Sequence, residues 1–310
     1  MNPAFSVIFF TTLTGAGYGM IMIAGVLAFA GRMPADRGFG IAFWIVALGS
    51  ISVGLLSSLF HLSHPERAWR SLTQWRSSWL SREGVAAMVT YVPAVILAWG
   101  WLVEGSTTGA WGIAGLAAAA AALVTVYCTA YIYRSLTTID AWANAYVLPG
   151  YVFMSLASGG LWLNAMAQLF GADLGEGFMQ GVIIVLFAVV ATKMGYWGYI
   201  DSGSHPSTPQ SATGMPATSP VSESAAPHTQ ENYVLKETGF QIGRKHGDKL
   251  RQIAVIAFFV VPITLLVLAI VTSQPGLSVI FSVIAAVSAT FGIIVERWLF
   301  FAQARHVVTL

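Results

Sequence analysis

Long apolar stretches follow one another along the chain, with only short polar breaks between most of them. Eight stretches each reach at least ~18 residues, which is the length that a membrane-crossing helix needs. They cover residues 5–31, 38–60, 84–103, 109–133, 145–170, 177–200, 252–271 and 276–302. Short connectors make consecutive helices antiparallel neighbours. The pattern therefore predicts an all-α integral membrane protein, a bundle of eight transmembrane helices forming a single domain over 1–310.

One connector, 201–249, is much longer than the others. Its first part, 202–230, is rich in Ser, Thr, Pro and Ala and has almost no large apolar residue. Such a composition cannot build a core, so we expect this part to be disordered. The second part, 233–251, is basic and is a candidate for ordering against a partner.

Composition supports the membrane assignment. The chain of 310 residues is 56% hydrophobic and only 9% charged, whereas a soluble domain carries about 25% charged residues. A net charge of +2 is too small to indicate nucleic-acid binding. The single cysteine, Cys128, cannot form an intrachain disulfide or a CxxC site, so any iron–sulfur cluster is expected in a partner. No Lys or Arg precedes the first apolar run, which we interpret as a retained span and not a signal peptide.

Basic residues are distributed unequally between the two sides of the predicted bundle. Eight spans place both termini and the loops 61–82, 134–144 and 201–249 on one side. That side carries Arg67, Arg70, Arg76, Arg82, Arg134, Lys236, Arg244, Lys245, Lys249, Arg251 and Arg305. The opposite side has only Arg32 and Arg37. By the positive-inside rule the basic side, with both termini, is cytoplasmic.

The loop after the second apolar stretch, FHLSHPERAWRSLTQWRSSWLSREG at 60–84, gathers many titratable groups. His61 ends the second span, and Glu83 falls in the first turn of the third, with Ser81 as its expected N-cap. An imidazole and a carboxylate at the water boundary of an apolar pocket can relay protons, which quinone chemistry requires. The structural alternative is that Glu83 complements the helix dipole and His61 reaches the interface. The residues alone leave both readings open.

Charged residues within the later spans lie near their expected cytoplasmic ends. These are Lys193, Glu296 and Arg297. Transporters and pumps usually place such residues near the membrane midplane, so the chemistry is expected at the cytoplasmic surface. Lys193 and Glu296 are weaker candidates for a quinone site. The residues expected to dock a partner are Arg67, Arg70, Arg76, Arg244 and Lys245.

Two segments carry a family resemblance. The 60–84 segment resembles the signature of the DmsC family of membrane anchors, and IYRSLTTIDAWANAYVLPGYVFMSLASGG at 132–160 resembles the family's loop between the fourth and fifth spans. Glu296 and Arg297 near the end of the last span fit as well, whereas 201–249 departs from the shorter family loop. The resemblance implies partners: a four-cluster iron–sulfur subunit and a molybdopterin catalytic subunit. It also implies electron exchange with ubiquinone or menaquinone, and no haem or metal in this chain.

The resemblance also implies functional residues, because the histidine and glutamate of the family's quinone site match His61 and Glu83. The opening MNPAFSVIFFTTLTGAGYG resembles the membrane subunit of sulfite-oxidising members. With the cytoplasmic charge bias, this favours a subunit of the bacterial inner membrane that passes electrons from cytoplasmic sulfite oxidation to quinone. One alternative is an anchor of the DMSO-reductase type that oxidises quinol. Another is a transporter or an assembly scaffold without redox work.

Overall fold

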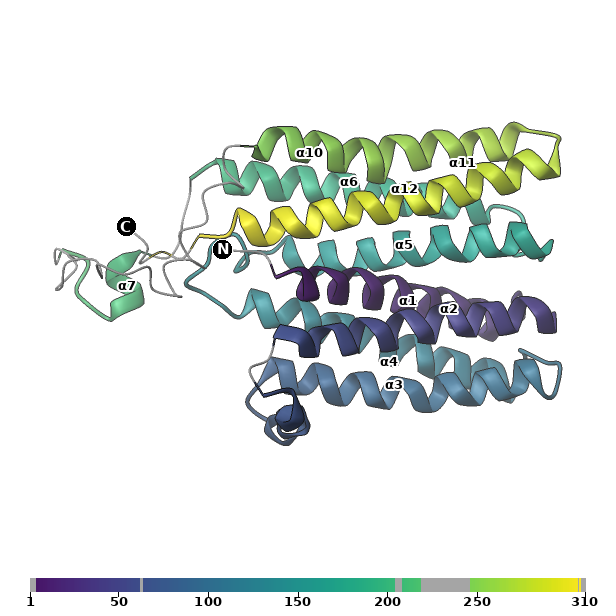
Figure 1. The fold of residues 1–310 in the computed structure, drawn as a ribbon, viewed down its shortest axis with the longest axis horizontal. Coiled ribbons are helices and arrows are strands. Elements are labelled where there is room, and N and C mark those ends of the chain that lie inside the picture. The colour runs from purple at the N-terminus through teal and green to yellow at the C-terminus, as the bar shows by residue number, and fades with distance from the viewer. Residues whose placement is uncertain (1–3, 62–63, 204–207, 219–245, 306, 308–310) are drawn as a thin grey trace.

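The computed structural model describes residues 4–61, 64–203, 208–218, 246–305 and 307, and all the regular elements in these ranges are helices. Seven long helices are α1 (Phe5–Phe29), α2 (Arg37–Ser57), α3 (Trp79–Leu102), α4 (Ala110–Arg134), α5 (Val147–Phe170), α6 (Phe178–Asp201) and α12 (Pro275–Ala302). Between α6 and α12, one further rod is assembled from α10 (Gly247–Val255), a π-helical segment (Ile256–Val260) and α11 (Val261–Val271). The helices run side by side along one axis (Figure 1).

The π-helical segment has a local cause in the sequence. Pro262 lies in the first turn of α11 and has no backbone N–H to donate to the preceding turn. The turn before it widens, and Ile256–Val260 adopts the π geometry while the rod continues in the same direction.

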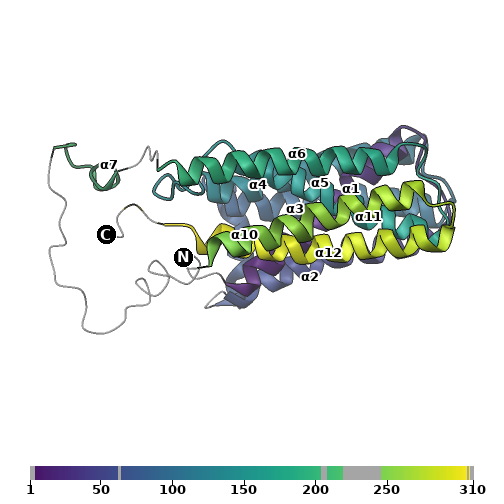
Figure 2. The same cartoon turned by 90° about the horizontal axis from the view of Figure 1, so that it is seen from above.

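Seven of the long helical rods are long and apolar enough to cross a membrane, and α5 is the exception. Its sequence includes Asn164, Gln168, one proline and four glycines with its C-terminal cap, so its apolar character is weaker. α5 nevertheless has 24 residues and runs beside the other helices through the middle of the bundle (Figures 1 and 2). A helix covered by other helices does not need a lipid-compatible surface, and small residues suit close helix packing.

Close helix contacts at the centre of the bundle depend on glycine. A Cβ on Gly19 of α1 would lie 1.8 Å from the Ser155 carbonyl oxygen of α5, and one on Gly159 would lie 2.2 Å from the Gly19 carbonyl carbon. On another side of α1, a Cβ on Gly25 would lie 2.1 Å from the carbonyl oxygen of Gly115 in α4. These contacts let α1 pack tightly between α4 and α5.

The long connectors gather at one end of the bundle, here called the loop-rich end. α1 begins there and α12 ends there, together with η1 (Ser58–His61), η2 (Pro65–Gln74) and the short helix α7 (Pro209–Thr213) (Figure 1). α7 lies inside the 202–230 segment expected to be disordered; most of that segment is outside the described residues, so the expectation stays a prediction.

Two helix starts differ from the expectation. The third helix begins at Trp79, five residues before the expected residue 84, and the seventh rod begins at Gly247 instead of 252. In both cases the added turn contains charged residues, Arg82 and Glu83 in the first and Asp248, Lys249 and Arg251 in the second, and therefore does not register as part of an apolar stretch. The helices extend beyond the apolar stretches into the loop-rich end.

Candidate functional site

Glu83 is a buried carboxylic acid near the loop-rich end. α3 directs it into the bundle, where the residue is only 4% exposed. Its Oε1 atom contacts the hydroxyl of Thr129 on α4 through a short hydrogen bond. The same hydroxyl lies 3.0 Å from the carbonyl oxygen of Thr125, one turn earlier on α4. Because a hydroxyl has one proton but two lone pairs, it can donate to an ionised Glu83, or accept from a protonated one while donating to Thr125.

The prediction that Ser81 is the N-cap of the third helix is wrong. α3 begins at Trp79 with Ser78 as N-cap, and no side-chain cap hydrogen bond forms there. Ser81 is therefore inside the helix, where it is buried and its hydroxyl has no partner among the described residues. The additional turn arises because Trp79 packs against Tyr131 of α4, with ring centroids 4.6 Å apart. Glu83 consequently lies in the second turn, beyond the positions where the helix dipole acts most strongly.

Two buried tyrosines interact electrostatically with the Glu83 carboxylate. Tyr18 of α1 and Tyr133 of α4 both lie within electrostatic range of it. The Tyr18 hydroxyl is buried and has no hydrogen-bond partner in the described part of the chain. A nearby hydrogen bond of 2.7 Å between Ser52 and Tyr91 joins α2 to α3. Glu83 therefore lies in a polar region enclosed by α1, α3 and α4.

The 65–78 loop is anchored to the start of α3 by Arg82. Its Nε donates to the carbonyl oxygen of Trp75 at 2.9 Å, and Nη2 donates to that of Arg76 at 2.7 Å. Its guanidinium also lies 4.2 Å from the ring centroid of Trp79. Leu72 of the loop packs over Gly84, where an added Cβ would meet Leu72 at 2.8 Å. This loop thus covers the helix end that carries Glu83.

An apolar groove of about 440 Å³ lies on the outer face of the α3–α4 pair. Trp75 and Arg82 lie at its loop-rich end, and the side chains lining the rest are Val85, Ala86, Val89, Ala121, Val124 and Cys128. Glu83 does not line the groove, because it points to the opposite face of α3. Cys128 is close to both, since it lines the groove and lies within electrostatic range of Glu83.

The other residues predicted to bind quinone or to dock a partner are placed as follows. His61 ends η1, but its side chain is not among the described ones. Arg244 and Lys245 lie outside the described residues altogether. Arg67, Arg70 and Arg76 are all exposed, as partner-docking residues must be. Arg70 and Arg76 each lie within 6 Å of the ring of the preceding tryptophan, at 5.6 and 5.3 Å.

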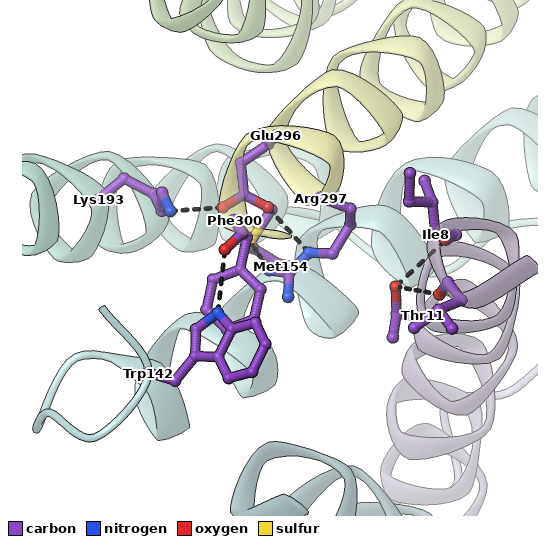
Figure 3. A network of polar contacts seen from close by, with 9 residues as sticks. Ile8, Thr11, Trp142, Met154, Lys193, Glu296, Arg297 and Phe300 are labelled. Carbon is purple, nitrogen blue, oxygen red and sulfur yellow. Dashed lines mark hydrogen bonds and ion pairs between the residues drawn. The ribbon is translucent and has the colours of Figure 1, made fainter. Parts of the chain in front are cut away.

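A second buried group joins α6 to α12 (Figure 3). The Lys193 ammonium forms a short hydrogen bond and ion pair with Oε1 of Glu296. Oε2 of Glu296 forms an ion pair with Nε of Arg297 at 2.8 Å. The side chains of all three residues are at most 6% exposed. The two weaker site candidates, Lys193 and Glu296, thus contact each other, and Arg297 completes a cluster of two cations and one anion.

Aromatic and sulfur groups enclose this ion cluster. The Lys193 ammonium lies 3.9 Å from the ring centroid of Tyr196. The Arg297 guanidinium lies 4.2 Å from that of Tyr151, and its Nη2 donates to the Met154 sulfur at 2.7 Å. The Tyr151 ring in turn stacks on Tyr133 at 5.9 Å. The stacked pair of Tyr151 and Tyr133 therefore contacts Arg297 of the ion cluster and also interacts electrostatically with Glu83.

Sequence reasoning missed the partners Thr129, Tyr18 and Tyr151. Thr129 and Tyr18 are two of several uncharged polar residues in apolar helices and have no distinctive spacing, so no local signal identifies them. The exception is Tyr151, which lies within the 132–160 segment that carries the family resemblance. The remaining contacts required knowledge of which helix faces meet.

The fold and the buried groups define a multi-span helical membrane protein whose buried ionisable side chains lie at one end of the bundle. The chain belongs to the DmsC family, the DMSO reductase anchor subunits, whose pattern matches residues 1–302. It is 32% identical over 325 aligned residues to a sulfite dehydrogenase subunit of Allochromatium vinosum, covering 99% of this chain and 97% of that protein. It is 30% identical over 158 residues to the anaerobic dimethyl sulfoxide reductase chain YnfH of Escherichia coli, covering 49% and 53%.

These matches confirm the resemblance in the 60–84 and 132–160 segments. The protein is a membrane anchor subunit of an oxidoreductase complex and is homologous to a sulfite dehydrogenase subunit.

Proposed function

We propose that this chain is the quinone-reactive subunit of a molybdopterin and iron–sulfur enzyme, and that it passes electrons from cytoplasmic sulfite oxidation to membrane quinone. The observation that carries this proposal is the similarity to the sulfite dehydrogenase subunit over 99% of the chain, against 49% for the DMSO reductase chain. The partners are a four-cluster iron–sulfur subunit and a molybdopterin subunit, which perform the substrate chemistry. The quinone is ubiquinone or menaquinone.

Glu83 and His61 are the proposed acid–base residues of the quinone site. The buried Glu83 carboxyl can hold a proton against the Thr129 hydroxyl or release it. The Tyr18 hydroxyl, which interacts electrostatically with Glu83 and has no hydrogen-bond partner among the described residues, is a further group that could bond to a quinone oxygen. Quinone, when bound, accepts two electrons and two protons. Lys193 and Glu296 pair with each other, which makes them weaker candidates for binding it.

The proposed topology has eight spans, with α5 as the fifth, and both termini in the cytoplasm of a bacterial cell. The loop-rich end then faces the cytoplasm and the partner subunits. Its exposed arginines, Arg67, Arg70 and Arg76, are proposed to dock the iron–sulfur subunit, together with Arg244 and Lys245. The arrangement puts the electron donor and Glu83 at the same membrane surface.

Paired substitutions in the purified complex test the proposed site. His61→Ala is expected to reduce sulfite-dependent quinone reduction by about 10²–10⁴-fold, while oxidation of sulfite with a soluble artificial acceptor is unchanged. Glu83→Gln is expected to have a milder effect and to change the pH profile. The matched controls are His64→Ala and Glu104→Gln, which change the same residue types at exposed positions. Full quinone activity in His61→Ala would move the site elsewhere, first to Lys193 and Glu296.

The substrate assignment has its own test. The purified complex is assayed for sulfite:quinone and for quinol:sulfoxide activity, and its molybdenum and iron are measured. Sulfite:quinone activity supports the proposal, and quinol:sulfoxide activity would instead support an anchor of the DMSO-reductase type. A preparation that folds but contains neither metal would favour a transporter or scaffold.

A further inference from the structure

A small cavity lined by buried polar and apolar side chains lies where α1, α5 and α12 meet, within about two turns of the loop-rich end of α1 and α12. Its volume is about 10 Å³. Its wall includes Arg297 of the ion cluster, Tyr151, Thr12, and the hydroxyl-bearing side chains of Thr11, Ser155 and Ser158. The cavity lies on the opposite side of Arg297 from Glu296, toward α1, whose Thr11 is seen beyond the arginine in Figure 3.

Three buried polar atoms of residues that line this cavity make no hydrogen bond of good geometry with the described residues, although the Tyr151 hydroxyl and the Arg297 guanidinium lie close enough to interact with each other. They are Nη1 of Arg297, the Tyr151 hydroxyl and the Thr12 hydroxyl. The residues themselves are 4%, 6% and 4% exposed. An unsatisfied buried polar group is costly, and three of them around one cavity point to a common partner other than the described side chains.

We propose that the cavity binds one ordered water molecule, which accepts a hydrogen bond from Nη1 of Arg297 and bonds to the hydroxyls of Tyr151 and Thr12. The volume corresponds to about one water-sized sphere, close to the minimum that holds a water molecule. Three partners are also the usual number for a buried water. A larger organic ligand does not fit, and water can both accept from the guanidinium and donate to a hydroxyl.

This water has a specific electrostatic role. Lys193, Glu296 and Arg297 together carry a formal charge of +1 when all are ionised, and Glu296 faces only the Nε side of the guanidinium. A bound water solvates the other edge of Arg297 where no anion is available. It also connects the ion cluster to the Tyr151 hydroxyl.

Structure determination of the assembled complex in lipid nanodiscs, at a resolution that reveals waters, tests the site directly. The expected result is a density peak within about 2.7–3.2 Å of all three atoms, in chloride buffer and in chloride-free gluconate buffer alike. An empty cavity would overturn the proposal. So would a peak present only with chloride, because that would identify a halide balancing the positive charge.

A matched pair of substitutions at Thr12 gives an independent test in the same complex. With the water in place, Thr12→Val removes one of its hydrogen bonds and should lower the thermal midpoint by about 2–4 °C, whereas Thr12→Ser keeps the hydroxyl and should lose less. If the cavity is dry, Thr12→Val removes an unsatisfied hydroxyl and should leave the midpoint unchanged or raise it. Tyr151→Phe should change the midpoint in the same direction as Thr12→Val.

Discussion

Replacing Glu296 with glutamine removes the only anion from the buried ion cluster. The carboxylate contacts Lys193 and Arg297, and its side chain is 2% exposed. Breaking a buried pair by removing one partner typically costs about 3–5 kcal/mol, because it leaves uncompensated buried charge. At about 2–4 °C per kcal/mol for a protein of this size, the thermal midpoint of the complex should fall by roughly 6–20 °C. Fluorescence-monitored melting in detergent or nanodiscs measures it.

Two other substitutions distinguish the effect of uncompensated buried charge from a nonspecific loss of stability. Asp201→Asn breaks the bidentate contact with Arg251 at 2.7 and 3.0 Å, but that Asp side chain is 58% exposed, so the expected loss is about 0–1 kcal/mol. Lys193→Met leaves Glu296 paired with Arg297 and brings the formal charge of the cluster to zero. It should therefore destabilise less than Glu296→Gln. The electrostatic reasoning would be refuted if Glu296→Gln and Asp201→Asn lowered stability equally, or if Lys193→Met lowered it more than Glu296→Gln does.

Three further predictions address topology, the long connector and helix packing. A reporter inserted near residue 215 should behave as cytoplasmic and one near Asp173 as periplasmic; a periplasmic signal at 215 would overturn the proposed orientation. Deleting 202–230 should leave the complex assembled and active by co-purification and turnover, and loss of assembly would show that this segment binds a partner. Gly159→Val should reduce the yield of folded complex in membranes, because a Cβ there would lie 2.2 Å from the α1 backbone. Gly49→Val is its control, since nothing lies within 4 Å of a Cβ at Gly49.

The sequence was sufficient to predict the class of fold, because membrane helices depend on a simple requirement for long apolar segments. The starts of the helices were less predictable. α3 extends to Trp79 through tertiary contact with Tyr131, and a span pattern based on apolar length cannot register that contact. For α5 the length of the apolar stretch predicts a span, whereas its hydropathy is lower than that of the other long helices. Its burial among the other helices accounts for this lower hydropathy, because few of its side chains need to face lipid.

The candidate site was predictable only in part. Glu83 could be selected because it stands at the edge of an apolar stretch and matches a family segment, and the structure places it in a buried polar region. Lys193 and Glu296 were selected singly for being charged, and their direct contact was not foreseen, since they are 103 residues apart in the sequence. Long-range side-chain partnerships of this kind depend on helix rotation, which an almost uniformly apolar pattern does not encode.

The depth of the buried charges favours chemistry at one membrane surface. Glu83 lies four residues from the start of α3, Lys193 eight from the end of α6, and Glu296 six from the end of α12. At 1.5 Å per residue these positions are about 6, 12 and 9 Å from the helix ends. In the other half of the bundle, the fully buried side-chain hydrogen bonds among the described residues are between uncharged groups, such as the Asn164 amide and the Ser282 hydroxyl at 3.0 Å. In the proposed quinone site, the shortest path from Glu83 to water therefore leads to the loop-rich side, the same side on which the partner is proposed to deliver electrons.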